Sequence, residues 1–324
     1  MKKQELQKVF TASSLEVADW GMDFHTLMLG DTLRMDAYKK AIFEVIKPGM
    51  SVCEIGVGTG ILSQWALEAG ARIIYGIEVN KKVLDVAQTN LAQFGDRFVP
   101  FEGFSQEVVL PEKVDLLLSE ILGNIVDNEN CVAILSDAIK RFLKDDGRML
   151  PIEATSYLVP ACAEQAHNDI GNKLIVSTHE GSLLIEKFEQ IDRSEMFNFY
   201  FDAIISEDAY LASPCAVMSF SKSIHEEIYA KKVKYTILAN GIMTGFKGWF
   251  RAQLSPSVVL DIESSESFST SWKHAFFPIE FPISVQGGDV VELEFSRSGD
   301  NKYQWRGEVK RKGETIGTFS QTIK

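Results

Sequence analysis

Short apolar runs alternate with amphipathic stretches over the first half of the chain. The apolar runs MSVCEIGVGTG, ARIIYGIEVN and VDLLLSEI contain or end near glycine or an acid, and ILSQWALEAG and KKVLDVAQTNLAQFG, with helical spacing, lie between them. The runs predict buried strands, and the stretches between them predict helices. A β-α-β-α-β order implies a mainly parallel sheet with helices on its faces.

The pattern changes near Pro151. Beyond it the helical spacing fades and β-rich segments follow, among them KYTILANGIMTGFKGWFRAQL and DVVELEFSRS. Turn signals at residues 298–301 and 312–313 separate such segments. The second half is therefore predicted to be antiparallel β structure, either a barrel or a sandwich.

Composition and charge narrow the functional classes. The 324 residues are 45 % hydrophobic and 24 % charged, which is typical of a globular protein. The net charge of −12 disfavours nucleic-acid binding and suits cationic ligands. The four cysteines are scattered without metal-ligand spacing, and no 18 apolar residues run together. We expect a cytoplasmic protein that holds no metal and binds neither nucleic acid nor membranes.

A glycine-rich loop is the first motif with chemical meaning. A predicted strand ends at Glu54 and turns through Gly56, Gly58 and Gly60 into a helix, which lets backbone amides approach a ligand closely. A dinucleotide-binding loop would have a small residue at the position of Ile61. The loop with its preceding acid therefore differs from that motif, and it resembles the cofactor loop of class I S-adenosylmethionine (SAM) methyltransferases.

Glu78 closes the next predicted strand, 18 positions after Gly60 (78 − 60). A carboxylate at that place can accept hydrogen bonds from both hydroxyls of a ribose. The alternative is a structural turn followed by an unrelated surface acid. The spacing of loop, strand and acid favours a cofactor site.

Two glutamates, Glu120 and Glu129, lie nine positions apart around a Gly123–Asn124 break. On an unbroken helix they would point to opposite faces, so they can share a site only if the chain reverses between them. They follow a predicted strand, at the sheet edge where open α/β sheets bind ligands. They are either unrelated surface acids or a pair that converges on a cation.

The segment VDLLLSEILGN with its later NE resembles the double-glutamate loop of the protein arginine methyltransferases, a class I SAM-dependent family. HTLMLGDTLRMDAYKKAI is similar to the N-terminal segment of that family, and TSWKHAFF to its late Thr-His-Trp loop. The resemblance extends over most of the chain. It implies an α/β fold with an N-terminal helical segment (1–40), a SAM-binding Rossmann-like domain (41–150) and an antiparallel β-barrel substrate domain (151–324).

The implied activity is transfer of a methyl group from SAM to a guanidino nitrogen of arginine in a protein or peptide. The guanidinium stays protonated and must approach a positive sulfonium, so Glu120 and Glu129 would offset the repulsion and fix one nitrogen in place. By position in the family pattern, Asp31 belongs to the same catalytic group. Neither a metal nor a covalent enzyme intermediate is required.

The resemblance also implies the cofactor and substrate contacts. Arg34 would bind the methionyl carboxylate of SAM, and Met28 would pack near the sulfonium. Gln106 stands where the family often has an adenine-contacting Glu. The other implied cofactor residues are Glu54, Gly56, Gly58, Gly60 and Glu78, and the implied substrate residues are His25, Ser271 and Trp272.

The sequence departs from the family pattern at several places. Ser271 replaces the histidine of the late loop, while His274 comes three positions later and is expected to be a barrel residue. Ile121 replaces a tryptophan beside the first glutamate. The helical arm that dimerises most members is shortened, so a homodimer would need a different contact.

These departures leave two alternatives open. One is methylation of free arginine or another guanidine metabolite, with Lys247 and Arg251 as candidate polar partners for its backbone groups. The other is a SAM-binding scaffold with weak catalysis, which the missing histidine favours and the intact glutamate pair disfavours.

Overall fold

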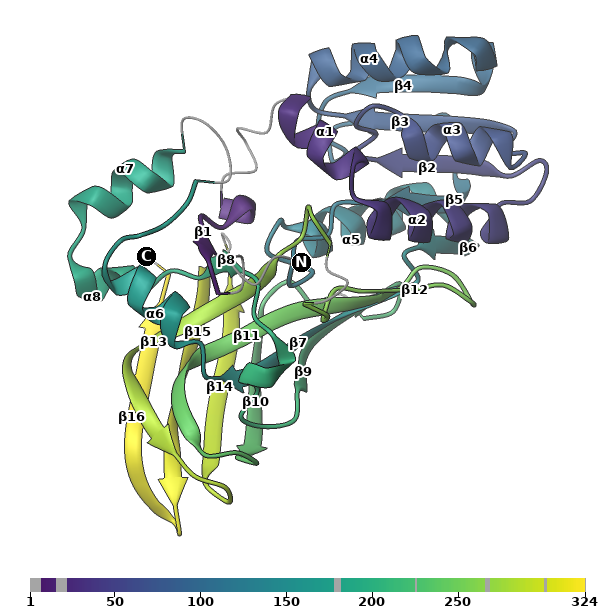
Figure 1. Cartoon of the computed structure of the whole chain (residues 1–324). Coiled ribbons are helices and arrows are strands. Elements are labelled where there is room, and N and C mark those ends of the chain that lie inside the picture. Colours follow the sequence, from purple (N-terminus) through teal and green to yellow (C-terminus); the bar gives the residue numbers. More distant parts are fainter. Residues whose placement is uncertain are drawn as a thin grey trace.

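A five-stranded parallel sheet forms the first half of the protein (Figure 1). The computed structural model describes residues 7–15, 22–177, 182–224, 226–265, 269–299 and 302–323. The strand order is β4-β3-β2-β5-β6, and each neighbouring pair is parallel. The strands are β2 (Ser51–Ile55), β3 (Ile73–Glu78), β4 (Phe98–Glu102), β5 (Val114–Ser119) and β6 (Leu143–Leu150). All five residues of β2 are buried, as expected for a central strand that is covered on both faces.

Helices pack against this sheet. Helix α2 contacts α3, which contacts α4, while α5 packs on β5 and β6. Their bounds are α2 (Thr32–Val45), α3 (Ile61–Glu68), α4 (Lys81–Leu91, followed by the 3-10 turn η4, Ala92–Arg97) and α5 (Cys131–Phe142), and α1 (Met22–Leu29) precedes α2. Asn80 caps α4 by accepting from the amides of Lys82 and Val83. The carboxyl ends of β2, β3 and β5 thus open onto helix N-termini.

Two antiparallel sheets form the second half. One has the order β1-β8-β13-β11-β7-β9 with β12 paired to β11, and the other has the order β10-β14-β15-β16. Contacts of β9 with β10 and of β13 with β16 close them into a barrel. The strands are β1 (Val9–Phe10), β7 (Glu153–Ala161), β8 (Phe201–Ala203), β9 (Cys215–Ser221), β10 (Tyr229–Thr236), β11 (Gly241–Gln253), β12 (Val259–Asp261), β13 (His274–Val285), β14 (Val290–Ser298), β15 (Lys302–Arg311) and β16 (Glu314–Thr322). The predicted fold class is confirmed.

The N-terminal segment, expected to be helical, also contributes strand β1 to the barrel sheet through its pairing with β8. Three helices, α6 (Glu164–Gly171), α7 (Leu183–Gln190) and α8 (Arg193–Met196), lie beside the barrel (Figure 1). Two short 3-10 turns are η2 (Ser13–Leu15) and η5 (Glu207–Ala209). No helix within the described residues is long and apolar enough to cross a membrane.

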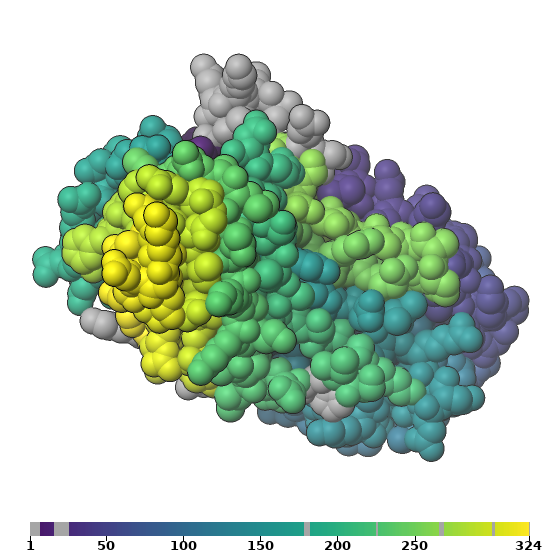
Figure 2. Space-filling model, turned by 90° about the horizontal axis from the view of Figure 1, so that it is seen from below, coloured from purple at the N-terminus to yellow at the C-terminus, as the bar shows by residue number. Residues whose placement is uncertain are grey.

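The two halves share one apolar core. Trp249, Phe250 and Trp272 of the barrel half pack in the same buried cluster as Tyr38 and Val52 of the parallel-sheet half. Figure 2 shows green barrel residues directly against teal and purple residues of the first half. The carboxyl edge of the parallel sheet therefore faces the barrel, and the candidate site lies at this junction.

Candidate active site

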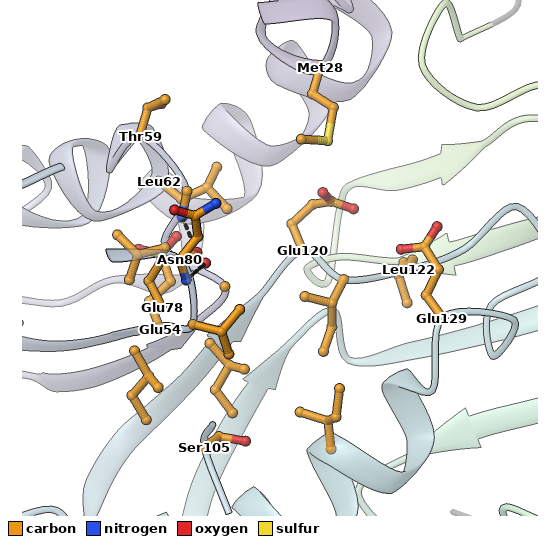
Figure 3. A pocket seen from close by; sticks show the side chains of 18 of the residues that line it. Met28, Glu54, Thr59, Leu62, Glu78, Asn80, Ser105, Glu120, Leu122 and Glu129 are labelled. Atoms are coloured by element: carbon orange, nitrogen blue, oxygen red, sulfur yellow. Dashed lines mark hydrogen bonds between the residues drawn. The ribbon is translucent and has the colours of Figure 1, made fainter. Parts of the chain in front are cut away.

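A cavity of about 1040 Å³ lies at the carboxyl ends of β2, β3 and β5 (Figure 3). Its walls come from the glycine loop, the end of β3, the segment after β5, helices α1 and α2, and the barrel segment at residues 271–272. The N-terminal helices, the loops of the parallel sheet and a barrel segment thus meet around one cavity. The residues that the sequence predicts for the site and that line this cavity are Met28, Arg34, Glu54, Gly56, Gly58, Glu78, Gln106, Glu120, Glu129, Ser271 and Trp272.

The three glycines of the loop have left-handed backbones, with φ of +74° at Gly56, +58° at Gly58 and +89° at Gly60. Side chains rarely tolerate this conformation. Gly56 and Gly58 line the cavity, but Gly60 does not. A Cβ at Gly60 would lie 3.0 Å from Leu91 Cδ1, so this glycine allows α3 to pack against α4.

Two acids support the loop in different ways. Glu78 accepts a hydrogen bond from the amide of Gly58 at 3.0 Å and another from the amide of Asn80 at 3.0 Å, which fixes its carboxylate at the cavity wall. Glu54 is fully buried and accepts from the hydroxyl of Ser63 in α3. Burial raises the pKa of Glu54 to about 8, and the neighbouring Glu78 adds to that shift. Glu54 thus anchors α3 as a mostly protonated acid at neutral pH.

The glutamate pair is brought together by a chain reversal. Glu120 follows β5, and Glu129 precedes α5 by two positions. Between them Gly123 and Val126 exchange backbone hydrogen bonds of 3.0 and 2.9 Å, which close the turn. Both carboxylates line the cavity and point toward the same space (Figure 3). The reversal predicted at Gly123–Asn124 is present.

Arg34 places a guanidinium against Glu120. It forms an ion pair with Glu120, with side chains only 8 % and 5 % exposed, and its Cζ lies 4.6 Å from the ring centroid of Trp272. Burial lowers the pKa of Arg34 to about 10, while electrostatic interactions with Tyr38, Asp31 and Glu129 oppose the shift. Among the described residues, Oε1 of Glu120 has no hydrogen-bond partner. Glu120 therefore keeps an acceptor available in the cavity wall.

Glu129 is held in a poorly solvated part of the cavity wall. Burial raises the pKa of its carboxyl to about 8, Arg34 opposes the shift and Asp202 adds to it. At neutral pH the group is mostly protonated, and an added cation would favour its ionised form.

Asp31, predicted to belong to the catalytic group, does not itself line the cavity. It is 1 % exposed and caps α2 by accepting from the amide of Arg34 at 3.2 Å. The same carboxylate accepts from the amide of Ser271 at 3.0 Å, from its hydroxyl at 2.7 Å, and from the hydroxyl of Ser269. Burial raises its pKa, but these hydrogen bonds outweigh burial and lower it overall. Asp31 ties the late barrel loop to α2.

Of the other residues considered in the sequence, two line the cavity. Met28 points its sulfur toward the space above Glu120 (Figure 3), and Gln106 also lines the cavity. His25 lies in α1, but its side chain is outside what the structure describes. His274 is a buried residue of β13 whose Nδ1 accepts from the amide of Ile205 at 3.0 Å, as expected for a barrel residue.

Comparisons with known proteins agree with this architecture. The family described as "PRMT5 oligomerisation domain" matches residues 153–312, and the family of ribosomal protein L11 methyltransferase (PrmA) matches residues 35–151. Protein arginine N-methyltransferase PRMT10 of Arabidopsis thaliana is 29 % identical over 307 residues, which cover 85 % of this chain and 80 % of the relative. Protein arginine N-methyltransferase 5 of Xenopus laevis is 27 % identical over 265 residues, covering 78 % and 39 %. The chain is thus similar to protein arginine N-methyltransferases over most of its length.

Solved structures of protein arginine methyltransferases have the same fold as this chain. The crystal structure of Arabidopsis thaliana protein arginine methyltransferase 10 superposes with a TM-score of 0.77 at 23 % identity, covering 93 % of this chain and 97 % of the other. The Trypanosoma brucei PRMT1 enzyme-prozyme complex with AdoHcy gives 0.78 at 20 % identity, covering 92 % and 96 %.

The structure adds site residues that the sequence did not indicate. Ser13 lines the cavity, and its amide and hydroxyl donate to Asp202 at 3.1 and 2.9 Å. Asn124 donates to the same carboxylate at 2.8 Å, which links the N-terminal segment to the glutamate turn. No local motif marks Ser13 or Asp202. Among the described residues no cluster of His, Cys, Asp and Glu could hold a metal ion.

The raised pKa of Glu129 predicts a pH-dependent loss of stability. Folding raises the pKa of this carboxyl from 4.5 to about 8, so between these pH values the folded state binds more protons than the unfolded state. The contribution of Glu129 to the free energy of unfolding therefore falls as pH rises. Glu129→Gln removes this dependence. Urea denaturation from pH 5 to 8 should show the variant gaining stability relative to the wild type as pH rises. The exposed Glu314→Gln serves as control, and equal slopes for Glu129→Gln and the wild type would contradict the raised pKa.

Proposed function

We propose that this protein is a SAM-dependent arginine N-methyltransferase that methylates a guanidino nitrogen of arginine in a protein or peptide. The observation that carries the proposal is the setting of Arg34, whose guanidinium lies against Glu120 and over Trp272 within the field of Glu129. These groups offer a guanidinium an acceptor, an aromatic face and negative charge. The names of the curated relatives support the same activity.

The cavity suits the cofactor. Left-handed glycines leave its wall free of side chains at Gly56 and Gly58, and Glu78 presents a fixed carboxylate beside them. Gln106 and Met28 complete the wall on which the adenosyl group and the sulfonium of SAM would lie. Arg34 is the residue to hold the carboxylate of the cofactor. When bound, SAM supplies a methyl group made electrophilic by its sulfonium.

The glutamates have distinct tasks in the transfer. Oε1 of Glu120 is available to accept from a substrate guanidinium, and Glu129 adds a second carboxylate on the same side. Their charge offsets the repulsion between two cations in a site of low polarity. One proton must leave the guanidinium as the new N–C bond forms. Glu129 can accept it in the ionised form that a bound guanidinium favours, and its carboxyl titrates near 8.

The positions of Lys247 and Arg251, the candidate partners of a free arginine, favour a peptide substrate. Lys247 is fully buried and donates to the carbonyl of Glu263 at 2.7 Å, while Arg251 lies 3.8 Å from Asp261 on the surface. Neither residue lines the cavity. They are therefore not the partners that the carboxylate of a free amino acid would need.

A cytoplasmic location and a homodimer are part of the same proposal. Acidic charge without a long apolar run supports the first, and the match of residues 153–312 to an oligomerisation domain family supports the second. Light scattering would test the dimer, and a monomer at all concentrations would remove it from the proposal.

Glutamine substitution at the glutamate pair should separate binding from chemistry. Glu120→Gln or Glu129→Gln keeps side-chain size but removes the negative charge that the carboxyl carries once the cations are bound, so turnover should fall by about 100-fold or more. Methylation of an arginine-rich peptide with labelled SAM measures the rate. SAM affinity by calorimetry and a thermal melt show whether the cofactor site and the fold persist in each variant, and all three measurements should stay near wild type for Glu314→Gln. Normal turnover in both variants would show that the glutamates take no part in the transfer.

Competition should identify the substrate class. An arginine-rich peptide and free arginine are supplied at equal concentration, and initial methylation rates are compared at low and raised salt. The net charge of −12 should attract a basic peptide, so we expect the peptide to be preferred and its rate to fall as salt screens the attraction. Preference for free arginine with little salt dependence would reverse the substrate assignment, and methylation of neither would support the scaffold alternative.

A further inference from the structure

The turn that carries Glu129 has an uncommon backbone. Val126 and Asn130 have φ of +62° and +61°, in the left-handed region. This conformation is unfavourable for a β-branched residue such as valine. It persists only where surrounding contacts impose it. The position of Glu129 therefore depends on whatever fixes the turn.

Arg297 supplies such contacts from the barrel. It lies on β14, flanked across the sheet by Tyr229 and Tyr303, and only 3 % of it is exposed. Its Nη1 lies 3.1 Å from Oδ2 of the fully buried Asp127. Its Nη2 donates to Oδ1 of Asn130 at 2.6 Å. A single guanidinium thus holds the residues two before and one after Glu129.

Further hydrogen bonds orient the guanidinium of Arg297 and connect Asp127 to helix α5. Nη1 of Arg297 also donates to the carbonyl of Glu227 at 2.6 Å, which fixes the plane of the guanidinium in the barrel. Oδ1 of Asp127 accepts from the amide of Val132 at 3.0 Å, in the first turn of α5. The planar guanidinium makes these contacts from two separate nitrogens at once, whereas an ammonium group would have to make them from one.

We propose that Arg297 is a positioning residue, which holds Glu129 in its working place through Asp127 and Asn130. The second domain would then set the geometry of the carboxylate pair as well as the substrate side of the cavity. The catalytic consequence rests on the proposed function, but the ordering of the turn does not.

Arg297→Met tests the proposal with two readouts. A misplacement of about 1 Å at a catalytic group costs on the order of 100-fold, so kcat should fall by about that factor while SAM affinity changes little. Hydrogen exchange at amides 123–131 should rise in the variant and stay near wild type in the parallel strands. Arg306→Met is the matched control, because Arg306 is a half-exposed arginine of the neighbouring strand whose partner is Glu294.

Two further variants distinguish positioning from a general loss of stability. Arg297→Met leaves Asp127 buried without its cation, and adding Asp127→Asn removes that unpaired charge. The double variant should therefore recover thermal stability without recovering kcat. Asn130→Gly, at a position that already favours glycine, removes one contact of Arg297 and should lower kcat less than Arg297→Met.

The outcomes are separable from those of the proposed function. The inference is overturned if Arg297→Met keeps its kcat and its exchange at 123–131, or if the double variant recovers kcat together with stability. It is also overturned if exchange rises evenly through both domains. If the wild type methylates neither peptide nor arginine, the proposed function fails, and the exchange measurement still decides whether Arg297 orders the turn.

Discussion

Buried negative charge is the constraint around which the cavity is organised. An ionised carboxyl removed from water needs a cation, a set of donors or a proton. Glu120 obtains the cation from Arg34, and Glu129 obtains the proton through its raised pKa. Asp31 obtains donors from α2 and the late barrel loop, and in doing so it brings Ser271 and Trp272 to the wall. The groups that stabilise these three acids come from different segments of the chain, which therefore meet at the cavity.

The barrel is consequently more than a platform for a substrate. Trp272 lies beneath the guanidinium of Arg34 and donates from Nε1 to the carbonyl of Leu122, within the glutamate turn. Asp202 of β8 receives hydrogen bonds from both Ser13 and Asn124. The parallel sheet thus supplies the cofactor side of the cavity, while the antiparallel half fixes the turn between the two glutamates from several directions.

Local patterns predicted the parts of the structure that depend on local chemistry. The parallel sheet, the glycine loop and the reversal between Glu120 and Glu129 follow from strand spacing and from residues that tolerate turns. The family resemblance added Arg34 and Trp272, but it could not give the partner of either side chain. Asp31 shows this limit most clearly, because its match to the family pattern gave its position and not the direction of its carboxylate. The link of Ser13 to Asp202, 189 residues away, depends on barrel register and has no local signal.

The ion pair of Arg34 has a consequence for the order in which ligands bind. Helix α2 holds Arg34 next to Glu120, so Arg34 competes for Glu120 with any guanidine that enters the cavity. The apparent affinity for that guanidine falls with the fraction of time that Arg34 occupies Glu120. A ligand with a carboxylate would give Arg34 another partner and release Glu120. The anionic end of one ligand and the cationic end of the other are then coupled through a single side chain. Thermodynamic reciprocity requires each to strengthen the binding of the other, a positive cooperativity that paired titrations would detect.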